Sequence, residues 1–192
     1  MKANNDIKRK LVDVTRHMID TNGLDSVSMR DLGKEMNLSR SAVYRHFKNK
    51  EDLLAAITAE NFEVINRRID KLMGEIDDSK ELIYAVLYTY YEFGISNPEH
   101  YHLMSQKQWN KEDYPDLHIS AFKLYEIIGR CFQKAHEQTH IRSNSPRQLT
   151  AMIAAFIHGL IELHLTGHLE AEKGLNDPAG LIKSFLDIVL KG

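Results

Sequence analysis

The chain of 192 residues contains only one cysteine, Cys131, so no disulfide can form within it. A single thiol fits a reducing compartment and excludes a disulfide-stabilised secreted fold. The first residues lack the continuous apolar segment of a signal peptide, and no window approaches the roughly 20 apolar residues of a membrane span. We therefore expect a soluble cytoplasmic protein with no membrane partner.

Strand signals are missing as well. The sequence has no run of alternating β-branched residues, no internal repeat and no low-complexity tract. Nearly every segment instead spaces its apolar residues as helices do. With 43% hydrophobic residues, the chain can bury one substantial core, or a small module attached to a larger one. These features predict an all-α fold.

Excess charge of either sign is small overall, with a net charge of −2, but it is unevenly distributed. Residues 1–50 hold 11 Lys and Arg against 6 Asp and Glu, a net +5, and the remainder holds 14 against 21, a net −7. A basic first quarter on an acidic body indicates that only the N-terminal part meets a polyanion. Charge preferences at helix ends could account for some of the asymmetry.

Helix-boundary residues and apolar spacing together predict about nine helices. The first starts near Ile7 and stops at Asn22-Gly23, because glycine commonly follows the end of a helix. Ser28, Ser39 and Asn49 are expected to cap the next three helices, at about 29–36, 40–46 and 50–73. Five further helices are expected at about 80–96, 98–108, 116–141, 146–169 and 178–190, three of them beginning at a proline.

Helices 29–36 and 40–46, separated by three residues, make a helix-turn-helix, the unit that places its second helix in the major groove of DNA. Its expected inner positions are Leu32, Met36, Leu38, Val43 and Phe47. The outer positions of its second helix are Arg40, Ser41, Tyr44, Arg45 and His46, whose side chains can donate to phosphates or base edges. The alternative is an ordinary helical hairpin with a solvated basic face.

The segment GLDSVSMRDLGKEMNLSRSAVYRHFKNKEDLL, residues 23–54, resembles the DNA-binding domain of the TetR family of bacterial transcriptional regulators. Its closing run, YRHFKNKEDLL, is especially typical of that family. Further along, AAFIHGLIELHLTGH is similar to a histidine-glycine run in the penultimate helix of one subgroup. The resemblance implies a DNA-binding domain at 1–50, with the helix-turn-helix at about 28–46, joined by a long helix to an all-helical effector-binding and dimerisation domain at 51–192. It also implies a regulator that is no enzyme and needs no cofactor.

Individual DNA contacts follow from the same resemblance. Arg30 corresponds to a base-contacting position, where a guanidinium can bind guanine O6 and N7 as a bidentate fork. Arg40, Ser41 and Ala42 fall where the family reads bases, Ala42 through apolar contact alone, for instance with a thymine methyl. Phosphate contacts are implied for Ser28, Tyr44, Arg45, His46 and Lys50, although Arg45 could equally be solvated. Lys50 lies in the first turn of the fourth helix, where the helix dipole also favours a phosphate.

The last two helices form the dimer interface in this family, and a dimer reads both halves of a pseudo-palindromic operator. Helices 146–169 and 178–190 are apolar on more than one side, so one face can pack internally while another meets a partner. The expected interface residues are Ile157, Ile161, His164, Ile182, Phe185 and Leu186. The alternative is a monomer that buries both faces.

An effector pocket is expected among the middle helices. Its aromatic lining suits a small hydrophobic or aromatic ligand, and the expected residues are Tyr88, Tyr91, His102, Met104, Trp109, Phe122 and Tyr125, with Tyr84 and His100 as further candidates. For any one of them, plain core packing is the competing role. Effector binding would move the fourth helix and tilt the two DNA-binding domains of the dimer. This movement would release a repressor from its operator.

A second motif, HEQTH at His136–His140, matches the H-E-x-x-H signature of zinc metalloproteases. On a helix whose apolar stripe centres on Ile128, however, Glu137 lies roughly opposite the stripe and faces solvent. His158 or Glu162 could in principle supply a third metal ligand. We expect no metal site and no enzyme, with a zinc hydrolase and a metal-sensing regulator as the alternatives.

Overall fold

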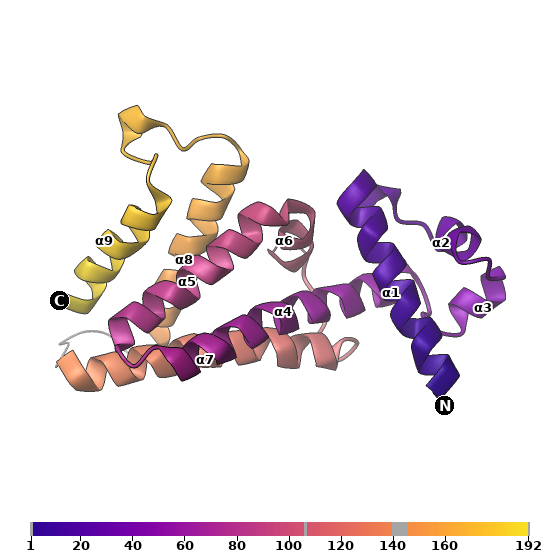
Figure 1. Cartoon of the computed structure of the whole chain (residues 1–192), viewed down its shortest axis with the longest axis horizontal. Helices are drawn as coiled ribbons and strands as arrows, with labels where there is room; N and C mark the ends of the chain where they lie inside the picture. Colours follow the sequence, from indigo (N-terminus) through magenta and orange to yellow (C-terminus); the bar gives the residue numbers. More distant parts are fainter. Residues whose placement is uncertain (1, 106, 140–145, 192) are drawn as a thin grey trace. The chain divides into compact units, whose positions relative to one another are not determined.

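The computed structural model describes the backbone except at residues 1, 106, 140–145 and 192, and it leaves the side chains of 2–5, 135–139, 146 and 191 undescribed. The described part is helical and contains no strand, which confirms the predicted all-α fold. Its elements are α1 (Lys2–Asn22), η1 (Leu24–Ser26), α2 (Met29–Glu35), α3 (Arg40–Tyr44), α4 (Lys50–Glu75), α5 (Ser79–Ser96), α6 (Pro98–Ser105), α7 (Pro115–Thr139), α8 (Pro146–Leu165), η2 (Ala171–Lys173) and α9 (Pro178–Lys191). Figure 1 labels the α-helices.

Contacts divide the chain into two compact units. Unit 1 comprises residues 1–62 and 99–120, and unit 2 comprises residues 63–98 and 121–192. The boundary therefore falls within α4 and α7, which differs from the division after residue 50 that the sequence predicts. The reason is that most of α6 and the segment after it share their contacts with the N-terminal helices.

Unit 1 is built around the helix-turn-helix. Leu11 and Ile19 of α1 pack with Leu32, Val43 and Phe47, all of them buried, in one apolar cluster. Met36 and Leu38 are partly buried against the same cluster. The predicted caps are confirmed, because the side-chain oxygens of Ser28, Ser39 and Asn49 accept hydrogen bonds from the backbone N–H groups of Asp31, Ala42 and Asp52 at 3.1, 3.2 and 2.8 Å.

Two turns in unit 1 depend on residues that tolerate unusual backbone or close approach. Gly23, with φ of 78°, ends α1 as predicted, and Asn37, with φ of 53°, lies in the turn between α2 and α3. A Cβ on Gly33 would lie 3.2 Å from the carbonyl oxygen of Leu38 and 3.4 Å from Cγ2 of Val43. The missing side chain therefore lets the two helices of the helix-turn-helix pack closely.

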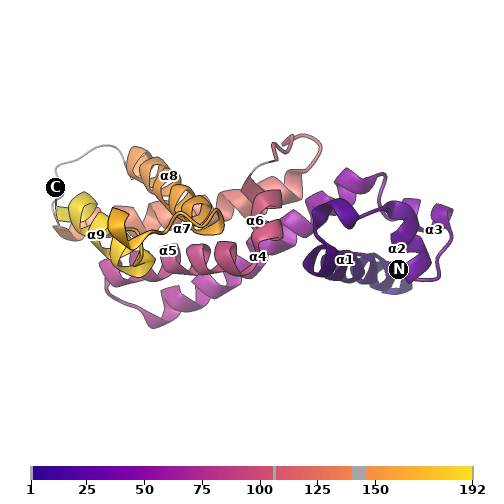
Figure 2. The same cartoon turned by 90° about the horizontal axis from the view of Figure 1, so that it is seen from above.

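Unit 2 is a helical bundle in which α5 packs against α8 and α9, as Figure 1 and Figure 2 both show. Its buried residues include Ile153 and Leu160 of α8 and Leu190 of α9. The rings of Phe156 and Phe185 stack with centroids 4.1 Å apart and join these two helices. The Cys131 thiol is buried, and burial raises its pKa, which favours a packed thiol over a reactive one.

The longest apolar stretch of the chain lies in α8. Arg147–Leu165 is long and apolar enough to cross a membrane by length and composition, with a mean hydropathy of 1.3. The prediction that no window approaches a membrane span is therefore wrong for this stretch. Its apolar character has a structural cause, because one face of α8 packs against α5 and α9 while Met152 and Leu163 remain exposed.

The N-cap of α5 can be tested by mutation. The Asp78 carboxylate accepts a hydrogen bond of 2.7 Å from the backbone N–H of Glu81. We expect Asp78→Ala to lower the free energy of unfolding by about 1 kcal/mol, since an N–H group at the helix start loses its partner. Asp77→Ala, which removes a charge from the same connection without touching the cap, is the matched control. Equal losses in urea titrations of the two variants would contradict the assignment.

Candidate nucleic-acid interface

The outer face of α3 carries four exposed residues: Arg40, Ser41, Tyr44 and Arg45. This short helix presents them because Ala42 and Val43 turn inward, and Val43 is fully buried. The Arg40 guanidinium lies over the ring of Tyr44, 5.4 Å from its centroid, which orients both side chains. The face thus combines two guanidinium groups and two hydroxyl groups, which are donors for base edges and phosphates.

Two of the residues expected to contact DNA from this face are less exposed than the other four. Ala42 is only 9% exposed, so little of its methyl group is open to a thymine, and its role as a base contact stays a prediction. It fills space behind the α3 face. His46 is half-buried just after the end of α3.

On α2, Arg30 is exposed, whereas Ser28 is half-buried and its hydroxyl is occupied. The Ser28 hydroxyl accepts from the backbone N–H of Asp31 and donates to the Asp31 carboxylate at 2.7 Å. The hydrogen bond from Ser28, followed by that from Lys34, lowers the pKa of the Asp31 carboxyl. Ser28 therefore serves as a helix cap, and a phosphate contact from its hydroxyl would require it to leave Asp31.

Lys50 lies in the first turn of α4, as the sequence predicts, and is half-buried. Its Nζ is 3.5 Å from the carbonyl oxygen of Leu24 in η1. The exposed Lys48 nearby was not among the expected contacts, although it belongs to the same KNK run. That run could have indicated it, because both lysines flank the exposed N–H groups at the start of α4.

The expected effector residues do not gather in one unit. His102, Met104 and Trp109 belong to unit 1, where Trp109 packs against the apolar cluster and its Nε1 donates to the carbonyl oxygen of Leu103 at 3.3 Å. His100 also belongs to unit 1, where it is buried between polar groups. The other members, Tyr84, Tyr88, Tyr91, Phe122 and Tyr125, belong to unit 2.

Within unit 2 these aromatic residues form two groups. Tyr84, Tyr88 and Tyr91 follow one another along α5 with ring centroids about 6 Å apart, and the Tyr91 hydroxyl bonds to Nδ1 of His164. Burial raises the pKa of Tyr91, and partial burial lowers the pKa of the half-buried His158, which contacts Tyr90. Phe122, by contrast, is 60% exposed and stacks on Tyr125. The Tyr125 hydroxyl donates to the carbonyl oxygen of Arg147 at 3.3 Å, at the surface, whereas the Tyr91–His164 contact is partly buried.

Four of the six expected dimer residues need correction. Ile157, Ile161, Ile182 and Leu186 are buried within unit 2, where they hold α8 and α9 in the bundle, so they offer no surface to a partner. Phe185 and His164 are half-buried. Among the described side chains of the two helices, the exposed large apolar residues are Met152, Leu163 and Ile188, of which Ile188 is 75% exposed. The spacing of apolar residues shows that each of these helices is apolar on more than one side. It does not show which side packs internally.

The HEQTH motif lies outside the residues whose side chains the structure describes. Its first four residues belong to the last turn of α7. Among the described residues, no group of three or more His, Cys, Asp or Glu side chains could hold a metal ion.

Comparison with known proteins supplies a family context for both units. Residues 11–57 match the family model described as bacterial regulatory proteins, tetR family, and residues 83–187 match the one described as tetracyclin repressor-like, C-terminal domain. An HTH-type transcriptional regulator of Staphylococcus aureus (strain USA300) is 21% identical over 90 residues, covering 47% of this chain and 49% of the relative. This chain thus spans about half the length of the staphylococcal relative it matches.

Two further proteins are similar over more of the chain. The nicotine-responsive transcriptional repressor HdnoR of Paenarthrobacter nicotinovorans is 25% identical over 126 residues, covering 63% of this chain and 64% of the relative. The crystal structure of the transcriptional regulator FadR from Bacillus subtilis, in complex with stearoyl-CoA, superimposes with a TM-score of 0.73 at 18% identity. That match covers 96% of this chain and 98% of FadR, and it shows a shared fold.

Proposed function

The chain belongs to the tetR family of bacterial regulatory proteins, and we propose that it is a ligand-responsive repressor that binds a pseudo-palindromic operator as a homodimer. The observation that carries this proposal is the exposed α3 face with Arg40, Ser41, Tyr44 and Arg45. These donors lie in the basic N-terminal quarter of an otherwise acidic chain. The family consists of transcriptional regulators, and we assign no catalysis to this chain. We place it in the cytoplasm, where operator DNA is accessible.

Base contacts are assigned to Arg30, Arg40 and Ser41, and phosphate contacts to Tyr44, Arg45, His46, Lys48 and Lys50. Exposure supports Arg30 and Arg40, because each can present its full guanidinium fork to a guanine. The residues that contact phosphates position the DNA-binding domain on the duplex without reading its sequence.

We assign the effector to a small hydrophobic or aromatic class. HdnoR is nicotine-responsive and FadR was crystallised with stearoyl-CoA, so similar proteins respond to or bind molecules with large apolar parts. In this chain, the exposed Tyr88 ring of α5 offers aromatic surface beside the buried Tyr91, whose hydroxyl bonds to Nδ1 of His164. An effector that binds one arrangement of these helices more tightly shifts the equilibrium between conformations that bind DNA and conformations that do not.

Dimerisation is assigned to the exposed face of α8 and α9, defined by Met152, Phe156, Leu163, Phe185 and Ile188 and hereafter called the α8–α9 face. Phe156 and Phe185 stack on each other and link the exposed residues of the two helices. Exposed large apolar residues such as Met152, Leu163 and Ile188 are typical of a protein–protein contact when they share one face.

The test of this function starts with selection of duplexes from a random-sequence library by the purified chain. We expect a pseudo-palindromic duplex to be enriched, and its affinity to fall steeply between 50 and 200 mM salt, as is typical when several phosphates are contacted. In a reporter strain, the chain should lower transcription from a promoter overlapping that duplex. The absence of any selected sequence would refute the proposal.

The Tyr44→Phe variant tests whether Tyr44 contacts a phosphate or reads a base. The variant removes only the hydroxyl and keeps the ring beneath Arg40. We expect it to weaken binding about 5-fold, and equally for the selected duplex and for random DNA, since one hydrogen bond to a phosphate is worth about 1 kcal/mol. Competition binding with both DNAs measures the ratio. A loss confined to the selected duplex would assign Tyr44 to base reading instead.

A further inference from the structure

The first turn of α6 is bonded to the end of α1 and to η1, the turn from which α2 starts. All the residues involved belong to unit 1. The Glu99 carboxylate accepts a hydrogen bond of 3.0 Å from the backbone N–H of Leu24, the first residue of η1. Leu24 is half-buried, and α2 has its N-cap at Ser28, four residues further along. The contact therefore fixes the backbone directly ahead of the helix-turn-helix.

The Leu24 residue is held from two sides. Glu99 binds its N–H group, and Lys50 of α4 approaches its carbonyl oxygen at 3.5 Å. Because Lys50 is also a proposed phosphate contact, η1 links α6 to a residue at the DNA surface. A displacement of Glu99 would leave the Leu24 N–H without this acceptor and would release one side of η1.

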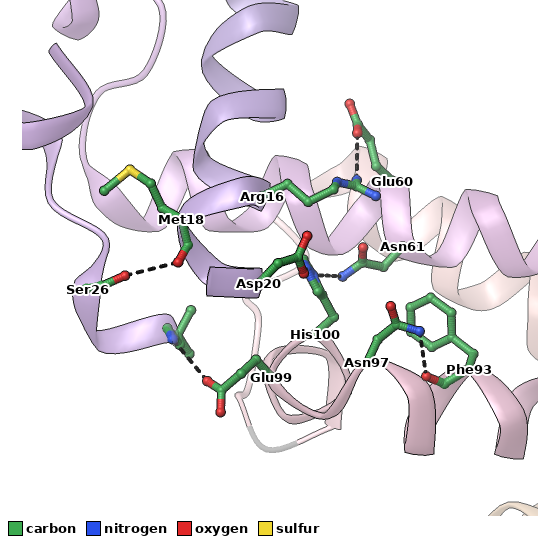
Figure 3. Close-up of polar contacts among 11 residues, drawn as sticks. Arg16, Met18, Asp20, Ser26, Glu60, Asn61, Phe93, Asn97, Glu99 and His100 are labelled. Atoms are coloured by element: carbon green, nitrogen blue, oxygen red, sulfur yellow. Dashed lines mark hydrogen bonds and ion pairs between the residues drawn. The ribbon is translucent and has the colours of Figure 1, made fainter. Parts of the chain in front are cut away.

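His100 makes the second connection, which Figure 3 shows together with the first. Its Nε2 lies 3.1 Å from the Asp20 carboxylate at the end of α1, and its Nδ1 lies 3.0 Å from the amide nitrogen of Asn61 in α4. His100 is only 4% exposed and Asn61 is buried. A neutral imidazole satisfies both contacts, since Nε2–H donates to Asp20 while Nδ1 accepts from Asn61.

We propose that Glu99 and His100 are positioning residues for DNA recognition, which hold the α1–η1 junction, and through it α2, in the arrangement that binds the operator. This inference rests on the proposed DNA-binding function. Both residues belong to the first turn of α6 (Pro98–Ser105), so α6 takes part in holding the DNA-binding arrangement.

The same geometry makes the connection sensitive to acid. Protonation of His100 would place an Nδ1–H donor against the amide donor of Asn61. Burial lowers the His100 pKa, an effect that Asp20 and Glu99 oppose and Arg16, itself paired with Glu60, reinforces. Because the folded pKa is below the unfolded value near 6.5, the contact stabilises the protein above about pH 6.5 and is lost as the pH falls through the folded pKa.

The experiment compares operator affinity in four variants with the duplex that the native chain selects. Glu99→Ala removes the acceptor and Glu99→Asp withdraws it by one methylene, so both should bind about 10-fold more weakly, because the competent arrangement becomes less populated. Glu99→Gln keeps an oxygen acceptor and should stay within about 2-fold of the native chain. The matched control is Glu60→Ala, which breaks the Arg16–Glu60 ion pair of 2.9 Å between α1 and α4 but leaves η1 untouched. It should bind like the native chain.

Two readouts separate positioning from a general loss of structure. Amide exchange at Leu24 should accelerate in Glu99→Asp and not in Glu60→Ala. In addition, His100→Asn should flatten the decrease in operator affinity between pH 7.5 and 5.5. If the native chain selects no duplex, the proposed function fails, and this inference with it. If it does select one, but Glu99→Asp binds it as tightly as the native chain, only the positioning role is overturned.

Discussion

Arg40→Ala is expected to lower affinity for the operator by roughly 30-fold or more and to relax base preference. One bidentate guanidinium–guanine contact contributes about 1–3 kcal/mol, and a homodimer makes two of them. Arg40 is exposed at the start of α3, next to Tyr44, where its fork is free to face the major groove. Titrations with the selected duplex and with single-base variants of it measure both effects.

Arg40→Lys and Lys34→Ala are the controls for this prediction. The lysine variant keeps the charge but not the planar fork, so it should retain affinity for random DNA while losing discrimination at one base pair of each half-site. Lys34 is exposed on α2 and pairs with Asp31 at 3.0 Å, so its removal should change affinity little. Unchanged base preference in Arg40→Ala would show that α3 does not read the groove through this residue.

Ile188→Arg is expected to convert the proposed homodimer into monomers and thereby to abolish high-affinity operator binding. Ile188 is the most exposed apolar residue of the α8–α9 face and lies one helical turn from the stacked Phe185. A central residue of such a face typically contributes about 2 kcal/mol or more, and a buried, unpaired charge adds a further cost. We expect the dissociation constant of the dimer to rise about 100-fold, measured by sedimentation.

Ile119→Arg is the matched control for the interface, because Ile119 of α7 is 68% exposed but lies outside the α8–α9 face. It should remain dimeric. Both substitutions replace side chains that are largely in water, so the helical content and thermal midpoint of the monomeric unit should stay close to those of the native chain. A dimer that persists in Ile188→Arg would assign the interface to another surface.

Local features of this fold could be predicted from the sequence. Ser28, Ser39, Asn49 and Gly23 mark helix ends through interactions that span a few residues, so their effect does not depend on the rest of the chain. The inner positions Leu32, Val43 and Phe47 follow the same short-range periodicity. The last residue of a helix follows less directly from the sequence than its first residue. The range of α6 ends at Ser105, three residues before the expected end.

The candidate sites could be predicted only in part. The exposure of the α3 face could be predicted from the sequence, because Arg40, Tyr44 and Arg45 point away from a core whose apolar positions are fixed by helical spacing. The interface residues Ile157 and Ile182 were misplaced, because α8 is apolar on more than one side and spacing alone does not identify the packed side. The expected pocket residues likewise divide between two units, since aromatic residues fill cores as readily as they line pockets.

Sequence alone determined the helical fold, the helix-turn-helix and the exposed donors of the α3 face, because each is encoded in contacts between residues that are close in the chain. The tertiary structure decided which apolar face of α8 and α9 is exposed and brought Glu99 and His100 to the end of α1. Glu99 and Leu24 are 75 positions apart, and His100 and Asp20 are 80 apart. No periodicity or local motif encodes such pairings, because they exist only after distant helices have packed.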